Sequence, residues 1–207
     1  MVLAAGAARR MGGRPKCLLE LDGEPLIRRL VHALDVAGIR SPVVVLGHHA
    51  QRISAALQGC AFTLALNPDP DAGLASSLQR GLRALPAESD AVMVLLADQP
   101  LIDAQDMLDL VAAYRDRPLG TQWVQPEVDG LPGNPVIFSD AVRAELLAGP
   151  ADMGGPQWRA LHPLAVWAWA SANTHYRTDV DSPQDIQALG ERSGHWLRWP
   201  THLWSSL

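Results

Sequence analysis

The chain has 207 residues, of which 48% are hydrophobic and 19% charged, a composition typical of a globular protein with a packed core. Its net charge of -5 argues against nucleic acid as a partner, because that binding requires a basic face that neutralises many phosphates. No apolar stretch approaches the ~18 residues of a membrane-spanning helix, and no signal-peptide pattern opens the chain. We therefore expect a single cytoplasmic domain over residues 1–207 that binds neither nucleic acid nor a membrane.

Short apolar runs alternate with segments of helical periodicity along the first half of the chain. The apolar runs predict strands, buried on both faces, over residues 2–5, 42–46, 61–66 and 91–97. Helices are predicted over residues 24–38, 49–57, 73–85 and 103–114. The less regular second half predicts strands over 121–125, 135–138 and 164–169, and helices over 140–147 and 182–189. This alternation indicates an α/β fold with a mostly parallel sheet, whose ligands bind at the carboxyl ends of the strands.

The first predicted strand leads directly into a loop over residues 3–16 that is rich in glycine and positive charge. It contains Gly6, Gly12 and Gly13 together with Arg9, Arg10, Arg14 and Lys16. Glycines let backbone N–H groups approach phosphate oxygens, and the cations neutralise phosphate charge. The loop fits neither a Walker A motif nor the G-x-G-x-x-G pattern. Four cations within eight residues of an acidic protein favour an anion site over an exposed basic turn.

The loop resembles the L-A-A-G-x-S-x-R-M-G signature, followed closely by lysine, of the MobA-like nucleotidyltransferases, most closely the molybdenum cofactor cytidylyltransferases. This resemblance covers about residues 2–189 and implies a Rossmann-like, three-layer nucleotidyltransferase fold. It also implies that Arg10 and Lys16 are catalytic and hold the triphosphate of an NTP. The rest of the loop would contact the nucleotide through Leu3, Ala4, Ala5, Gly6, Met11 and Gly12. Ala8 replaces the usual serine, which removes one hydroxyl.

A turn-rich segment over residues 67–78 precedes the third predicted helix. Asn67, Gly73 and Ser77 match the N-P-x-x-x-x-G-L-x-x-S pattern of the same family. The resemblance implies that these three residues line the nucleotide pocket and recognise the base. A plain turn followed by a capped helix explains the prolines of this segment equally well.

Asp98 stands at the exit of the most apolar predicted strand, where a carboxylate is well placed to bind a hard cation. Mg²⁺ prefers oxygen ligands and commonly takes one or two carboxylates with substrate phosphate. Asp98 also resembles the D-x-P metal site of the family, which implies a catalytic role with Mg²⁺, Mn²⁺ being the alternative ion. A helix cap or turn is the competing interpretation of this aspartate.

Residues 130–138 resemble the family element G-x-P-G-H-P-V-L-F, which borders the acceptor pocket. The resemblance implies that the acceptor contacts Gln99, Pro100, Gly133, Asn134 and Pro135. Asn134 replaces the usual histidine and cannot titrate near neutral pH, so an acid or base role at this position is in doubt.

Residues 176–186 resemble the D-I-D-T-P-E-D-L motif that lies near the C-terminal end of the family's sequences. Ser182 before Pro183 also predicts the start of a helix. Asp179 and Asp181 alternate along an extended segment, so one of them can face the metal. We favour Asp181 as the second metal ligand and keep Asp179 as the alternative. The Trp-rich tail over residues 190–207, with Trp196, Trp199 and Trp204, is expected to pack on the body of the protein or on a partner subunit.

Together these motifs predict transfer of a nucleotidyl group from an NTP to the terminal phosphate of an acceptor, with release of pyrophosphate. The L-A-A-G start points to CTP, and the acceptor would then be molybdenum-loaded molybdopterin, with a molybdenum hydroxylase or its chaperone as a downstream partner. Two alternatives stay open. One is a nucleotidyltransferase that acts on a sugar phosphate or another small phosphate. The other is a non-catalytic carrier of the finished molybdenum cofactor, an alternative that stays open because Ala8 and Asn134 depart from the family pattern.

Overall fold

The computed structural model of the chain describes residues 1–201. An eight-stranded sheet forms its centre, with the strand order β10-β7-β9-β6-β1-β4-β5 and with β8 paired to β7. These strands are β1 (Val2–Ala4), β4 (Val43–Leu46), β5 (Thr63–Leu66), β6 (Ala91–Leu96), β7 (Trp123–Val128), β8 (Leu131–Pro132), β9 (Val136–Ser139) and β10 (Val166–Ala170). Within residues 1–201, no helix is both long enough and apolar enough to span a bilayer.

The sheet is mostly parallel. β5, β4, β1 and β6 run in one direction, and β10 runs parallel to β7. β9 is antiparallel to both of its neighbours, β6 and β7. In the register of the central strands, Leu3 of β1 lies between Val45 of β4 and Leu96 of β6. The predicted α/β fold with a mostly parallel sheet is therefore confirmed, and β9 and the short β8 run in the opposite direction.

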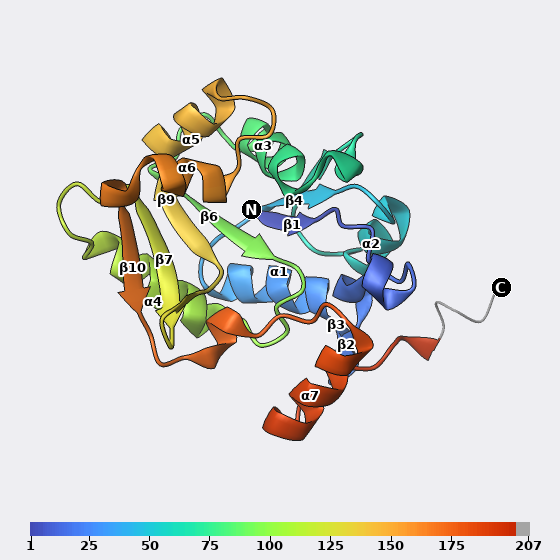
Figure 1. Cartoon of the computed structure of the whole chain (residues 1–207). Helices are drawn as coiled ribbons and strands as arrows, with labels where there is room; N and C mark the ends of the chain where they lie inside the picture. The colour runs from blue at the N-terminus through green and yellow to red at the C-terminus, as the bar shows by residue number, and fades with distance from the viewer. Residues whose placement is uncertain (202–207) are drawn as a thin grey trace.

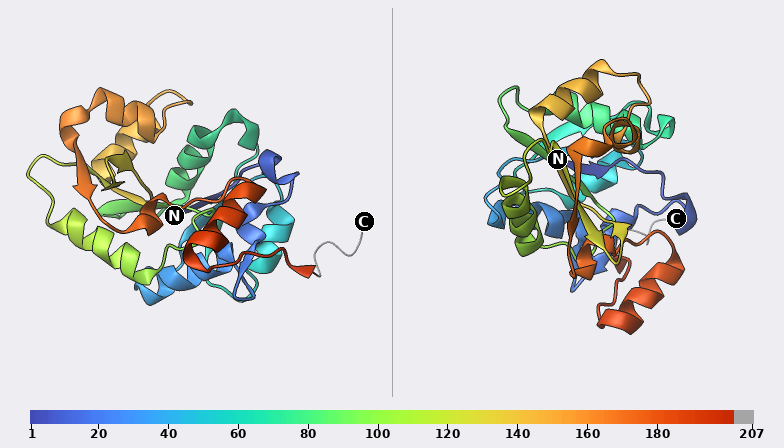
Figure 2. Two further views of the ribbon diagram at one scale, coloured as in Figure 1. Left: turned by 60° about the horizontal axis from the view of Figure 1, so that its bottom comes forward. Right: turned by 60° about the vertical axis from the view of Figure 1, so that its left-hand side comes forward.

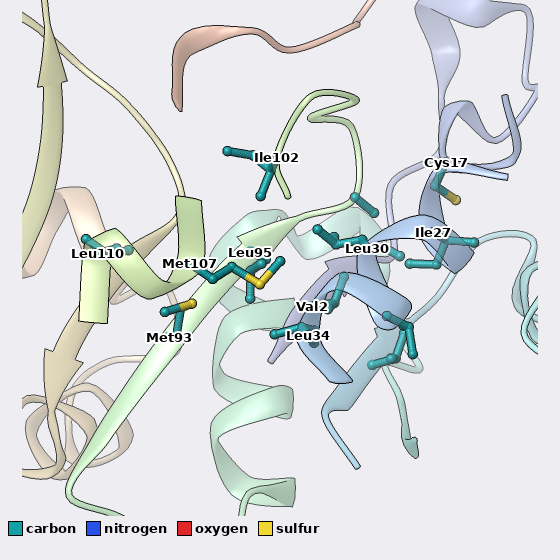
Figure 3. Packing of buried hydrophobic residues seen from close by; sticks show 14 of the residues in the cluster. Val2, Cys17, Ile27, Leu30, Leu34, Met93, Leu95, Ile102, Met107 and Leu110 are labelled. Carbon is teal, nitrogen blue, oxygen red and sulfur yellow. The ribbon is translucent and has the colours of Figure 1, made fainter. Parts of the chain in front are cut away.

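Helices cover both faces of the sheet and complete three layers (Figure 1). The helices on one face are α1 (Leu26–Val36), α2 (Ala50–Ala56) and α4 (Ala104–Arg115). Those on the other face are α3 (Leu74–Ala84), α5 (Asp140–Ala148) and α6 (Gly155–Leu161). Side chains alternate along the central strands between the two cores, so Val2 packs under α1 while Leu3 faces α3. Figure 3 shows side chains of α1 and α4 packed around Val2, Met93 and Leu95.

A smaller cluster joins the two ends of the described chain. The hairpin of β2 (Glu20–Leu21) and β3 (Glu24–Pro25) lies beside α7 (Pro183–Ser193), away from the main layers (Figures 1 and 2). Trp196 packs against Gly190, where an added Cβ would lie 2.3 Å from the indole ring. The Arg14 guanidinium lies 5.7 Å from the ring centre of Trp199. The predicted packing of the tail is confirmed for these two tryptophans, and Trp204 lies outside the described residues.

Three local predictions differ from the structure. The first helix begins at Leu26 and not at residue 24, because residues 24–25 pair with β2 as the second strand of the hairpin. β5 is not buried on both faces: Ala65 faces the core, whereas Leu64 and Leu66 are 50% and 48% exposed at this outer strand of the sheet. Helix α6 was not predicted, because Gly154, Gly155 and Pro156 are typical of a loop. The helix can nevertheless form, because the proline lies in the first turn, where a backbone N–H has no partner within the helix.

Candidate active site

The carboxyl ends of β1 and β6 form the natural ligand site of this topology. From β1 the chain moves outward through β4 to β5, and it then returns to the other side of β1 as β6. Loops that leave strands on the two sides of such a switch point border one crevice. A cavity of about 270 Å³ lies here, lined by Leu3, Ala4, Gly6, Ala8, Pro15, Lys16, Cys17, Ile53, Leu74, Leu96, Ala97 and Asp98.

The glycine-rich loop folds back tightly after β1. The backbone N–H groups of Met11 and Gly13 both donate to the carbonyl of Ala8, at 2.9 and 3.1 Å. Ala8, Gly12 and Gly13 all have positive φ, a conformation that glycine adopts freely and alanine does not. The loop also rests on Gly47 at the end of β4, where an added Cβ would lie 3.0 Å from the carbonyl oxygen of Ala5. Packing therefore determines the position of the loop above the sheet.

Four charged side chains from three parts of the sequence meet beside this cavity, which Lys16 and Asp98 line. The Lys16 ammonium donates to Asp98 Oδ2 at 2.6 Å and to Asp181 Oδ1 at 2.5 Å. Arg10 donates to the other oxygen of Asp181 at 2.7 Å. The N–H of Val180 donates to the carbonyl of Asp98 at 3.0 Å, which ties this late segment to the end of β6. The structure thus brings together four of the residues that the motifs predicted to form the site.

The charges of the cluster favour the ionised forms of Lys16 and Asp181. Burial alone would lower the pKa of Lys16, but the charges of Asp98 and Asp181 and their hydrogen bonds raise it overall. Burial likewise opposes ionisation of Asp181, but the hydrogen bonds and charges of Lys16 and Arg10 hold its pKa below the ordinary value. Asp179 differs: burial and then the negative charge of Asp98 raise its pKa. Of the two aspartates left open by the sequence, Asp181 is therefore the one bound to the cations of the loop.

The donor set suits a hard divalent cation. Asp98 and Asp181 direct carboxylate oxygens at one shared cation, the Lys16 ammonium. Asp98 Oδ1 is buried and accepts no hydrogen bond from any residue within 1–201. A buried, unpaired carboxylate oxygen is costly unless a ligand satisfies it. Oxygen ligands of this kind are those that Mg²⁺ and Mn²⁺ prefer.

A second group of ligand-type residues lies at the start of α4, where Asp103, Asp106 and His175 approach one another. Asp103 and Asp106 form a reciprocal capping box at this helix end. Asp106 also accepts hydrogen bonds from Asn173 at 2.5 Å and from His175 at 3.0 Å. These bonds explain the cluster as a connection between α4 and the segment that follows β10.

Several residues predicted to bind the nucleotide have structural roles in the protein. The Asn67 amide donates to the hydroxyls of Ser76 and Ser77, at 2.7 and 3.0 Å. Gly73 has a φ of 97° at the start of α3, and Met11 packs into the core beside α7. Contacts from these residues to a nucleotide would come from the backbone or from their neighbours, and their binding role stays a prediction.

One of the five predicted acceptor residues, Asn134, lines a larger cavity of about 550 Å³, between α3, α6 and the strands β6, β9 and β7. It adjoins the smaller cavity, because Leu3, Leu74 and Leu96 line both. Asn134 lines its wall, while Gln99 donates to the carbonyls of Asn134 and Tyr176, at 3.0 and 3.1 Å. Gly133 packs against the same Tyr176 carbonyl, and Pro100 and Pro135 are buried. Gln99 and Gly133 therefore position the loop that contains Asn134, and its contact with an acceptor stays a prediction.

Other residues that line this cavity were missed by the sequence motifs. The rings of Trp123 and Phe138 stack at 4.6 Å between centres, and both border the cavity. Arg159 reaches it from α6. The adjacent apolar residues Trp123 and Val124 at the start of β7 could have indicated that Trp123 is buried, but Arg159 lies on a helix that the sequence did not predict.

Comparison with known proteins places this architecture among nucleotidyltransferases. The bifunctional protein GlmU of Sorangium cellulosum is 37% identical over 120 residues, which cover 55% of this chain and 25% of that protein. The chain thus spans about a quarter of the length of the curated relatives it matches.

Solved structures match along almost the whole chain. A nucleotidyl transferase from Methanothermobacter thermautotroptrophicus superposes with a TM-score of 0.74 and 23% identity, covering 92% of this chain and 94% of that one. Rv0371C from Mycobacterium tuberculosis, solved in complex with manganese, gives a TM-score of 0.71 at 22% identity, with 92% and 96% covered. At these identities the likeness establishes the three-layer nucleotidyltransferase fold. The sequence also matches the MobA-like NTP transferase domain over residues 1–166 of 207, and the chain belongs to that family.

Proposed function

We propose that the protein is a metal-dependent nucleotidyltransferase that transfers a nucleotidyl group from an NTP to a phosphate of an acceptor. The observation that carries this proposal is the cluster of Arg10, Lys16, Asp98 and Asp181, which lies at the glycine-rich loop and the carboxyl ends of β1 and β6. Two cations and two carboxylates at this place suit a triphosphate bound together with a divalent ion. Membership of the MobA-like family supports the same reaction class.

Arg10 and Lys16 bind the triphosphate in this proposal. Both cations are engaged by carboxylates, and phosphate oxygens are equivalent partners for them. Lys16 exchanges a carboxylate for phosphate as the nucleotide enters, and its raised pKa keeps it charged throughout. Asp98 and Asp181 would then hold Mg²⁺ or Mn²⁺, which supplies positive charge against the charge that builds on the leaving pyrophosphate. The manganese complex of Rv0371C supports a divalent ion of this size.

The reaction requires little beyond positioning and charge neutralisation. An oxygen of the acceptor phosphate attacks the α-phosphorus, the bond to the pyrophosphate oxygen breaks, and a phosphoanhydride forms. The attacking phosphate is already ionised near neutral pH, so no general base is needed, and Asn134 can replace a histidine without loss of chemistry. The adjoining cavities would hold the two substrates with their phosphates next to Lys16.

We propose CTP as the nucleotide and molybdenum-loaded molybdopterin as the acceptor, on the strength of the motif resemblance. A volume of about 550 Å³ is within the usual range for sites that bind small molecules, roughly 300–1,000 Å³, and accommodates an acceptor of that size. A sugar phosphate would fit the same cavity and remains the alternative substrate. A molybdenum hydroxylase or its chaperone would receive the product. A non-catalytic carrier is disfavoured, because delivery of a finished cofactor does not need cations and carboxylates arranged for a triphosphate and a metal.

Pyrophosphate release tests this function. Purified protein is incubated with Mg²⁺, each of the four NTPs in turn, and either molybdenum-loaded molybdopterin or a panel of sugar phosphates. We expect release with CTP and molybdopterin. Release with sugar phosphates alone would replace the acceptor, and no release with any pair, together with tight cofactor binding, would favour the carrier.

The variant Asp98→Asn should abolish turnover while leaving the fold intact, because it removes one metal ligand and keeps the side-chain volume. Asp71→Asn is the matched control, since this exposed carboxylate pairs with Arg9 in the neighbouring loop, outside the cluster. Near-normal turnover of Asp98→Asn would refute the metal assignment.

A further inference from the structure

Arg159 is a half-buried cation for which the described chain provides no counter-charge. Its Nε atom is buried and has no hydrogen-bond partner among residues 1–201. Burial lowers the pKa of its guanidinium, and no carboxylate compensates. Its guanidinium carbon lies 5.9 Å from the ring centre of Trp123, which offers a weak cation–π contact and no hydrogen-bond acceptor. Burying a charge without a partner is costly, so this arrangement calls for an anion.

A second donor without an acceptor borders the same space. The indole Nε1 of Trp123 is buried and donates to no residue within 1–201. Trp123 as a whole is 3% exposed, and its ring stacks on Phe138. Both Trp123 and Arg159 line the cavity of about 550 Å³ that also contains Asn134. The packing that positions them is tight: an added Cβ on Gly155 of α6 would lie 2.8 Å from the Trp123 ring. An unpaired guanidinium nitrogen and an unpaired indole N–H therefore belong to two residues in the wall of one largely apolar cavity.

We propose that Arg159, assisted by the Trp123 indole N–H, binds an anionic oxygen group of the acceptor substrate, at a distance from the phosphate that reacts. This inference rests on the proposed function, because it takes the larger cavity as the acceptor site. Arg159 does not line the smaller cavity that contains Lys16 and Asp98. The group that Arg159 binds is therefore a second anionic group of the acceptor, such as a phosphate, a carboxylate or an acidic ring oxygen. The rest of the acceptor packs against the apolar walls of the cavity. A guanidinium suits such a group, because its planar donors can bind two oxygens at once.

Asp152 is the one carboxylate in the described wall of this cavity, and it offers a competing explanation. If Asp152 closed onto Arg159, the arginine would be structural. The two side chains form no ion pair in the structure, where the pKa of Arg159 responds to burial alone. On our proposal Asp152 repels the anion weakly, so Asp152→Asn should leave anion binding unchanged or strengthen it.

Two measurements on the full chain test the inference. In steady-state kinetics with CTP and molybdenum-loaded molybdopterin, Arg159→Met should raise the KM for the acceptor at least about tenfold and leave the KM for CTP within about twofold. Arg159→Lys should recover part of the loss, because it restores the charge but not the planar donors. The second measurement needs no turnover: binding of anilinonaphthalenesulfonate, an aromatic anion, is followed by its fluorescence. Arg159→Met should weaken this binding at least about fivefold, whereas Arg9→Met, at an 81% exposed loop cation, should not change it.

The outcomes separate this inference from the function on which it rests. If the wild type turns over and Arg159→Met keeps its acceptor KM, the inference is wrong and the function stands. If no NTP and acceptor pair reacts but dye binding depends on Arg159, the anion site stands and the proposed function fails. If no NTP and acceptor pair reacts and dye binding does not depend on Arg159, both fail. Equal losses for Arg159→Met and Asp152→Asn would mean that the two residues form a structural pair, which also overturns the inference.

Discussion

Replacing Lys16 by methionine should make the protein bind a divalent ion more tightly while destroying its activity. The ammonium contacts Asp98 and Asp181 at 2.6 and 2.5 Å, so it occupies the position between the two proposed metal ligands. A metal ion and an ammonium compete for the same carboxylates. Methionine keeps much of the length and apolar stem of the side chain but removes the competing charge.

The size of the effect follows from the charges involved. The Lys16 side chain is 24% exposed and the two carboxylates 19% and 26%, so water screens the cluster in part. A doubly charged ion about 4 Å from an ammonium is repelled by roughly 2 kcal/mol in bulk water and roughly 8 kcal/mol at an effective dielectric constant of 20. Lys16 can swing away, so we take the lower figure, which predicts about 30-fold tighter binding. Turnover should fall by about 10² to 10³, because the cation facing the triphosphate is lost.

The assay is a titration of metal-free protein with Mn²⁺, in which the free ion is followed by electron paramagnetic resonance. The raised pKa of Lys16 keeps the ammonium charged up to at least its ordinary value of 10.5, so the wild-type affinity should not change between about pH 7 and 9 through this group. Without metal, the Lys16→Met variant should melt at a lower temperature than wild type, and added Mn²⁺ should raise the melting temperature of the variant again. Arg9→Met, which removes a loop cation outside the cluster, is the control. Unchanged or weaker Mn²⁺ binding by Lys16→Met would refute the reasoning.

Three further substitutions test the surroundings of the site. Gly47→Ala should raise the KM for the nucleotide without a large loss of stability. The added Cβ would lie 2.6 Å from Pro70 and 3.0 Å from the Ala5 carbonyl, so it would displace the glycine-rich loop. An unchanged KM would contradict this account. Gly133→Ala, whose Cβ would lie 2.6 Å from the Tyr176 carbonyl, should lower the free energy of unfolding by about 1–3 kcal/mol in a urea titration. Asp179→Asn should stabilise the protein at neutral pH, by less than about 1 kcal/mol after allowance for solvent screening. Because the folded state raises the pKa of Asp179, the ionised form is the costly one, so this gain should disappear as the pH falls below about 3.8, and a gain that persists at lower pH would point to another cause.

Local patterns in the sequence were sufficient for most of the elements and for the core of the site. The hydrophobic periodicity of α1 and the apolar run of β6 directly reflect which faces are buried. Ser182 and Pro183 specify the start of α7 through a capping box that lies within a few residues. The loop from Leu3 to Lys16 was recognisable because its glycines, its cations and the strand before it are adjacent in the chain. Interactions within one turn or one loop can be read in this way, since few alternatives compete with them.

Tertiary structure decided everything that depends on contacts between distant segments. Strand order is one case: β9 pairs antiparallel between β6 and β7, and no local pattern specifies a partner for a strand. The choice of Asp181 over Asp179 is another, because it depends on how residues 179–181 bind the end of β6 and meet Lys16. Arg159 is the third, since its proposed role depends on the cavity that it lines and on the lack of a hydrogen-bond acceptor for its Nε atom among residues 1–201. The motifs therefore predicted the kind of chemistry, and the packing of remote segments determined which side chains meet at the proposed site.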